Sequence, residues 1–223
     1  MKFHNQSARF KTSHRQLARR ALVLCLFLGV TLVAGEPPAE ADWRVGIAGN
    51  LCPRNTFTTP IPGAKETKFT AAYSTAGGGS AESLRYLDTE AFAALGVDWA
   101  TFVAKTAAAA SAELANLKPE ILRDRNDVIE CAILRAKCPA DNITVAVLAP
   151  DFLKRFTPFF GRKILVVVPD RHTVYLFPTL ASRYQAYGEK ILSVYNKSTC
   201  PVSREVFELS STGLRAIGAY GGP

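Results

Sequence analysis

The chain has 223 residues, of which 27 are basic and 19 are acidic, and its net charge of +8 is concentrated near the N-terminus. Residues 42–223 keep 21 basic and 17 acidic side chains, so their net charge is only +4. This modest charge argues against a nucleic-acid-binding protein, and 182 residues are enough for one domain with a hydrophobic core.

The N-terminal segment has the three parts of an export signal. Residues 1–20 contain six basic side chains and no acidic one, residues 21–35 form an apolar run of 15 residues, and Ala39-Glu40-Ala41 is a small-x-small cleavage site. A bilayer-spanning helix needs about 20 apolar residues, so the run favours a cleaved signal peptide over an anchor. We therefore expect residues 1–41 to be a signal peptide of an exported protein, periplasmic or extracellular, with at most peripheral membrane contact. The route of export, general or twin-arginine, stays open.

Removal of residues 1–41 leaves few side chains for metal or redox chemistry. His172 becomes the only histidine, so we predict no metal site, and no cofactor motif is present. The four cysteines that remain are Cys52, Cys131, Cys138 and Cys200. An even number in an oxidising compartment predicts two disulfides with three possible pairings, and buried free thiols are the alternative.

Residues 42–83 are predicted to form an irregular N-terminal arm, because they contain turn-forming clusters and little periodic apolar pattern. Residues 84–223 are predicted to form a single α+β domain, with a mixed, largely antiparallel sheet and helices packed on one face. Asp88 or Thr89 and then Asp98 are candidate N-caps. The predicted helices are 89–95, 98–117, 150–159 and 178–194.

Six segments rich in β-branched and aromatic residues predict the strands of this sheet. They are 127–134, 142–148, 163–168, 173–177, 205–209 and 214–218. The turn at residues 135–141 predicts that the first two pair as a hairpin, and the turn at 169–172 predicts a second hairpin from the next two.

Three segments of the sequence together resemble a known bacterial family. They are Leu95-Gly-Val-Asp-Trp99, Lys163-Ile-Leu-Val-Val-Val-Pro-Asp-Arg-His-Thr-Val-Tyr-Leu-Phe177 and Pro201-Val-Ser-Arg-Glu-Val-Phe207. Over about residues 84–220 the chain resembles a bacterial family of unknown function, number 1444 among such domains. The resemblance implies no activity, cofactor or catalytic residue, because none is assigned to that family.

The tip of the 163–177 hairpin carries the residues best suited to catalysis. Asp170, Arg171 and His172 are adjacent there, and a histidine base would need a nucleophile such as Ser203 or Ser80. Neither serine lies in a Gly-x-Ser-x-Gly elbow. The simpler interpretation is that Asp170 and Arg171 satisfy each other or the turn, and that Ser203 caps a turn before the next strand.

The segment 152–163 interleaves four basic residues with four phenylalanines. Such a patch could bind anionic lipid, a cell-wall polymer or an acidic partner. The alternative is a short amphipathic helix whose phenylalanines enter the core while its basic residues stay in water. The predicted binding residues are Lys154, Arg155, Arg162 and Arg171.

The sequence therefore favours a non-enzymatic envelope or periplasmic module that binds an unknown protein or cell-envelope polymer, and not nucleic acid. A small hydrolase that uses His172, oriented by Asp170, is the alternative. The first interpretation predicts that substitution of Lys154 and Arg155 leaves folding intact and abolishes binding.

Overall fold

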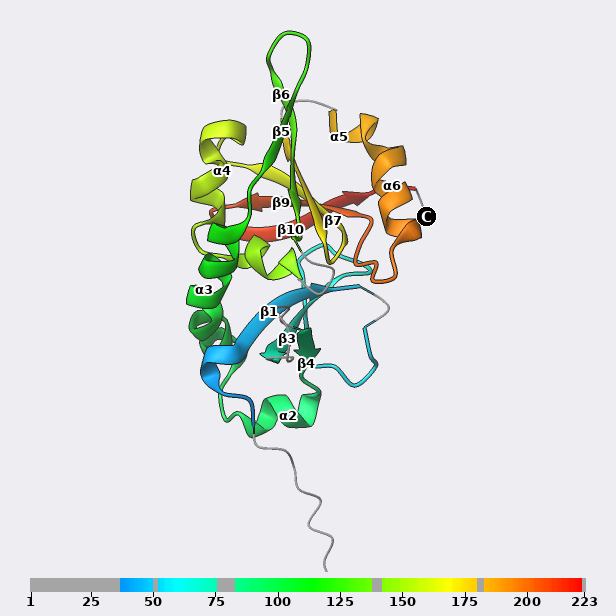
Figure 1. Ribbon diagram of the computed structural model, residues 1–223. Coiled ribbons are helices and arrows are strands. Elements are labelled where there is room, and N and C mark those ends of the chain that lie inside the picture. The colour runs from blue at the N-terminus through cyan, green and yellow to red at the C-terminus, as the bar shows by residue number, and fades with distance from the viewer. Residues whose placement is uncertain (1–36, 50–51, 76–82, 138–141, 180–182, 222–223) are drawn as a thin grey trace, which may run out of the picture. The chain divides into compact units, whose positions relative to one another are not determined.

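The computed structural model describes residues 37–49, 52–75, 83–137, 142–179 and 183–221, and Figure 1 shows their arrangement. Helices and antiparallel sheets both contribute, which confirms the predicted α+β class. The basic and apolar parts of the predicted signal peptide lie outside the described residues. The Gly-rich residues 76–80, which include Ser80, also lie outside them. None of the helices in the described ranges is long and apolar enough to cross a membrane.

A four-stranded sheet occupies the region predicted to be an irregular arm, which corrects that prediction. Its strands are β1 (Trp43–Ala48), β2 (Thr58–Pro60), β3 (Lys68–Thr75) and β4 (Ser83–Tyr86). Strand β3 is central, with β1 antiparallel along one side and with β2 and β4 paired to the two halves of its other side. The pairing of β1 with β3 passes over β2, and β2 and β4 are only three and four residues long, so the turn-rich sequence gave little sign of this sheet.

The second sheet has six strands in the order β10-β9-β7-β8-β6-β5, and every neighbouring pair is antiparallel. Its strands are β5 (Glu120–Arg123), β6 (Ile129–Arg135), β7 (Ile164–Asp170), β8 (Thr173–Pro178), β9 (Glu205–Ser210) and β10 (Gly213–Ala219). The hairpin β7–β8 agrees with the prediction, and β9 and β10, which pair as a further hairpin, lie close to two of the predicted strands. Strand β5 was not predicted.

The segment 142–148 was predicted to be a strand, but Ile143–Leu148 form a 3-10 helix, η2. The Asn142 side chain accepts a hydrogen bond from the Thr144 backbone N–H at 3.1 Å and so caps this helix. Strand β6 pairs with β5 and β8 instead, so the predicted hairpin is wrong. A short run of buried apolar residues fits a strand and a buried helix equally well, which is why the pattern misled.

The predicted helices 89–95, 98–117 and 150–159 correspond to α2 (Thr89–Ala94), α3 (Trp99–Asn116) and α4 (Phe152–Phe160). The predicted helix 178–194 is wrong at its start, because Pro178 ends β8 and two helices follow, α5 (Arg183–Ala186) and α6 (Gly188–Lys197). The carboxylates of Asp88 and Asp98 each accept a backbone hydrogen bond at 2.7 Å from the residue three positions later. These are the N-caps that the sequence indicated.

Both faces of the six-stranded sheet are covered. Alternate residues of β7 show this, since Ile164 and Val166 pack in the core with α4 and η2, whereas Leu165 and Val167 pack with Ile191 of α6. In Figure 1, α3 and α4 lie on one side of this sheet and α5 and α6 on the other. The structure thus adds a second covered face to the predicted arrangement, and it explains why every residue of β7 is buried.

A third cluster, which is rich in aromatic rings, joins the four-stranded sheet to α2 and α3. The Trp43 ring of β1 stacks on Phe102 of α3 with centroids 5.1 Å apart, and Phe57 stacks on Phe92 at 3.7 Å. The resulting cluster holds β1 and β3 against the N-terminal half of α3. It fixes the position of the loop between β1 and β2, on which the candidate site is built.

Residues 37–41, at the end of the predicted signal peptide, contact the domain. The Trp43 indole N–H donates to the Pro38 carbonyl at 3.0 Å, and Lys105 of α3 forms an ion pair with Glu40. Cleavage after Ala41 would remove both contacts.

Candidate functional site

The tip of the β7–β8 hairpin is organised by its own hydrogen bonds. The buried Asp170 carboxylate accepts from the His172 backbone N–H at 3.0 Å, which is the turn-stabilising role that the sequence suggested. The Arg171 Nε donates to His172 Nε2 at 2.9 Å. That imidazole nitrogen is therefore occupied as an acceptor, and a proton-abstracting role for it has no geometric support.

Ser203 belongs to a different network. Its side chain is only 1% exposed, its Oγ hydrogen bonds Thr67 Oγ1 at 2.7 Å, and it accepts from the Glu205 backbone N–H at 2.9 Å. The last bond is the local turn cap predicted for this serine. The buried Glu205 carboxylate also accepts from the Lys65 backbone N–H at 2.6 Å. Ser203 and Glu205 therefore hold the loop before β3 against the start of β9.

The basic-aromatic segment is mostly part of the core. Of its four phenylalanines, Phe152, Phe156 and Phe160 are buried, and only Phe159 is exposed, at 42%. The Arg155 guanidinium donates to the Leu114 and Leu117 carbonyls at the end of α3, the second at 2.6 Å. Arg155 is thus a structural contact between α4 and α3.

The remaining basic residues of this segment differ in their surroundings. Lys163 pairs with Glu208 at 3.4 Å, whereas Lys154 and Arg162 are exposed. The prediction that Lys154 and Arg155 could be substituted together without affecting the fold is corrected for Arg155. Lys154 and Arg162 stay predicted binding residues.

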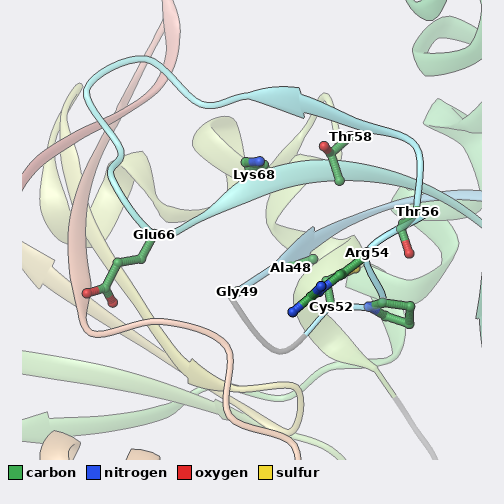
Figure 2. Close-up of a pocket in the computed structure, with 9 residues that line it drawn as sticks. Ala48, Gly49, Cys52, Arg54, Thr56, Thr58, Glu66 and Lys68 are labelled. Atoms are coloured by element: carbon green, nitrogen blue, oxygen red, sulfur yellow. The ribbon is translucent and has the colours of Figure 1, made fainter. Parts of the chain in front are cut away.

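A polar pocket of about 130 Å³ lies where the end of β1, the following loop, β2 and the start of β3 meet (Figure 2). Its lining comes from Ala48, Gly49, Cys52, Pro53, Arg54, Thr56, Thr58, Glu66 and Lys68. In register, Lys68 lies opposite Ala48 of β1 and Pro60 of β2, so the central strand presents it between its two neighbours. Every lining residue belongs to the region that the sequence indicated as an arm.

The charges around the pocket are unbalanced. Its one carboxylate, Glu66, forms an ion pair with Arg204 at 2.9 Å. Figure 2 shows Glu66 at the opposite end of the pocket from Arg54, Cys52 and Thr56. Arg54 and Lys68 are exposed and form no ion pair with any residue that the structure describes. The pocket therefore offers two cationic groups and the hydroxyls of Thr56 and Thr58, which suits a small anionic group.

The Cys52 thiol in this pocket is not an activated nucleophile. Burial raises its pKa above the ordinary 9.0, and this effect exceeds the opposing effects of a Thr56 hydrogen bond and the Lys68 charge. The thiol is therefore protonated at neutral pH, and the reactive form of a cysteine is the thiolate.

The pKa of the Tyr86 hydroxyl, at the end of β4, is raised. Burial is the largest cause, the Cys52 thiol raises the pKa further, the Arg171 charge lowers it, and the Cys200 thiol raises it. Arg171, a predicted binding residue, is therefore one of the charges that act on Tyr86.

The described cysteines, Cys52, Cys131 and Cys200, are free thiols, and Cys138 lies outside the described residues. Within the described ranges, no group of three histidine, cysteine or acidic side chains could hold a metal ion.

The sequence offered little to single out Arg54 and Lys68. The aromatic and β-branched residues in Lys68–Thr75 are the one signal that could have indicated a strand with a charged residue at its start.

Comparisons with models of protein families, with curated proteins and with solved structures found no match. The resemblance to the family of unknown function therefore stays a prediction.

Proposed function

We propose that this protein is a non-enzymatic, exported binding module that holds an anionic group of a cell-envelope polymer or partner protein in the pocket beneath Arg54. The observation that carries the proposal is the pair of exposed cations, Arg54 and Lys68, which no acidic side chain of the described chain neutralises. Cationic side chains without a counter-ion, beside hydroxyl donors, can bind an anionic ligand through charge-assisted hydrogen bonds.

The size of the pocket fits an end group or a side group of a larger molecule. A cavity of about 130 Å³ is small compared with pockets that enclose a whole metabolite or drug-sized ligand. A phosphate or carboxylate of a polymer fits this size, and the rest of the polymer would lie on the surface outside.

The alternative, a hydrolase that uses His172 with Asp170, is not proposed. The Asp170 carboxylate accepts from the backbone of its own turn, His172 Nε2 accepts from Arg171, and Ser203 is buried in another network.

The test is the binding of two fluorescently labelled polyanions, a polyphosphate and a polyglutamate, measured by anisotropy at two salt concentrations. The pocket variant is Arg54→Ala/Lys68→Ala, and the matched control is Lys154→Ala/Arg162→Ala. The control removes the same charge from exposed positions on and just after α4. We expect the pocket variant to bind at least about tenfold more weakly than the control, since charge-assisted hydrogen bonds are lost in one case only.

Equal losses in the two variants would show nonspecific attraction and would contradict the proposal. A loss in the control alone would move the binding surface to α4, as the sequence first suggested.

A further inference from the structure

The sequence carries a second candidate cleavage site upstream of Ala39-Glu40-Ala41. At the end of the apolar run, Val33-Ala34-Gly35 also has short side chains at the first and third positions of the small-x-small pattern. A cut there would leave Glu36 as the new N-terminus, six residues before Asp42. Both sites satisfy the same pattern, so the sequence alone does not choose between them.

The segment just before β1 belongs to the folded domain, whose compact unit spans Pro37–Pro223. This segment leads into β1 through a short 3-10 helix, η1 (Glu40–Asp42). The indole of Trp43, which is buried, donates its N–H to the Pro38 carbonyl at 3.0 Å. A chain that began at Asp42 would keep the indole in the core but lose the acceptor of its N–H group.

Charged side chains also join this segment to α3. Glu40 forms an ion pair with Lys105, and the Lys105 ammonium lies 5.5 Å from the centre of the Trp43 ring. The ion pair is exposed, so its contribution to stability is small. It nevertheless shows that Glu40 has a defined place on the surface of α3.

The surroundings of Arg44 depend most on where the chain begins. Its side chain is buried, and its guanidinium donates to the Ala41 carbonyl at 2.8 Å and to the Trp43 carbonyl at 2.9 Å. A cut after Ala41 would remove the first acceptor. The Asp42 backbone N–H, which donates to the Ala39 carbonyl at 2.9 Å, would become a charged amino group. Two positive charges two residues apart, one of them buried, repel each other more strongly than in water.

We propose that the export signal is cut after Gly35, so that the mature protein begins at Glu36 and keeps residues 36–41. The reaction is hydrolysis by the peptidase that removes export signals. Water adds to the Gly35 carbonyl carbon and the C–N bond to Glu36 breaks, which leaves a carboxylate on Gly35 and an ammonium group on Glu36. The mature chain then keeps the Pro38 and Ala41 carbonyls and the Glu40 carboxylate in their places.

This proposal rests on the export that the proposed function includes, and not on the anionic ligand. It replaces the predicted cut after Ala41 and assigns residues 36–41 to the mature protein. The pocket of Arg54 and Lys68 lies elsewhere in the four-stranded sheet, so the polyanion assay reports on the ligand whichever site is cut.

The experiment follows the processing of the full chain during export from a bacterial host. The exported form is identified by its intact mass and by N-terminal sequencing. Two matched variants, Gly35→Leu and Ala41→Leu, each place a large side chain at the third position of one site, where the pattern requires a small one. We expect the parent and Ala41→Leu to begin at Glu36, and Gly35→Leu to accumulate as uncut chain.

An N-terminus at Asp42 in the parent would overturn the proposal, and so would processing that is lost in Ala41→Leu and kept in Gly35→Leu. A parent that stays uncut inside the cells would overturn both this proposal and the export part of the proposed function. Urea denaturation gives a second measurement. A chain that begins at Asp42 should unfold at lower urea than one that begins at Glu36, and equal midpoints would overturn the structural reason for the upstream cut.

Discussion

Replacement of Arg155 by alanine should destabilise the fold, whereas replacement of its neighbour Lys154 should not. Arg155 lies on α4 and donates two hydrogen bonds to the carbonyls of Leu114 and Leu117 at the end of α3. The last carbonyls of a helix lack partners within the helix, so the guanidinium satisfies groups that would otherwise be unpaired. Lys154 is exposed on the same helix and makes no comparable contact.

The size of the effect follows from these contacts. Hydrogen bonds to a charged group contribute about 1.5–3 kcal/mol each, and the positive charge also favours the C-terminus of a helix. The guanidinium carbon is also 5.5 Å from the centre of the Phe156 ring, a contact that alanine would lose. Because Arg155 is partly exposed, we take the lower end of that range and expect a loss of about 3 kcal/mol in the free energy of unfolding.

Urea denaturation monitored by tryptophan fluorescence measures this difference. We expect Lys154→Ala to lie within about 0.5 kcal/mol of the parent protein and Arg155→Ala to unfold at clearly lower urea. A domain of this size should lose roughly 9 °C in melting temperature for 3 kcal/mol. Arg155→Lys, which keeps the charge but not the two-pronged geometry, should fall between the two. Identical midpoints for the two alanine variants would refute the structural role of Arg155.

Three further predictions concern a close contact between two backbone segments, a buried thiol and the hydrophobic core. Gly49→Ala should cost about 2 kcal/mol or more of stability because its Cβ would overlap the Val202 carbonyl, whereas Gly218→Ala, with open space around it, should be close to neutral in the same urea assay. The free energy of unfolding should fall as the pH rises above about 9, because the unfolded chain releases the Cys131 proton at its ordinary pKa of 9.0 while the folded chain keeps it up to about 12. Thermal melts from pH 7 to 10.5 test this, and an equally steep fall in Cys131→Ala would contradict it. Phe156→Ala should lose about 3–5 kcal/mol on urea denaturation, since the ring is fully buried, and a smaller loss than in Lys154→Ala would refute its place in the core.

Local patterns in the sequence were sufficient for most of the elements between residues 88 and 219. The N-caps Asp88 and Asp98, the hairpin at Asp170–Thr173 and the second hairpin at Ser210–Gly213 depend on interactions between residues close in the chain. Such interactions can be recognised from residue type and spacing alone. The amphipathic nature of α4 was also visible, because three of its phenylalanines recur at helical spacing and enter the core.

Contacts between distant residues decided the rest. Residues 43–75 form strands only because β3 supplies a common partner for β1, β2 and β4, and the pattern within each segment is too short or too irregular to indicate this. The run 143–148 became a 3-10 helix because it is enclosed on all sides, which removes the alternation that separates strand from helix. The pocket also depends on contacts between distant residues, since Arg54 and Lys68 come together only when β3 lies beside β1 and β2. Amino-acid type thus determined the local turns, caps and helices. The tertiary structure decided which basic side chains are free to bind, because it brought carboxylates or carbonyls to the other basic side chains.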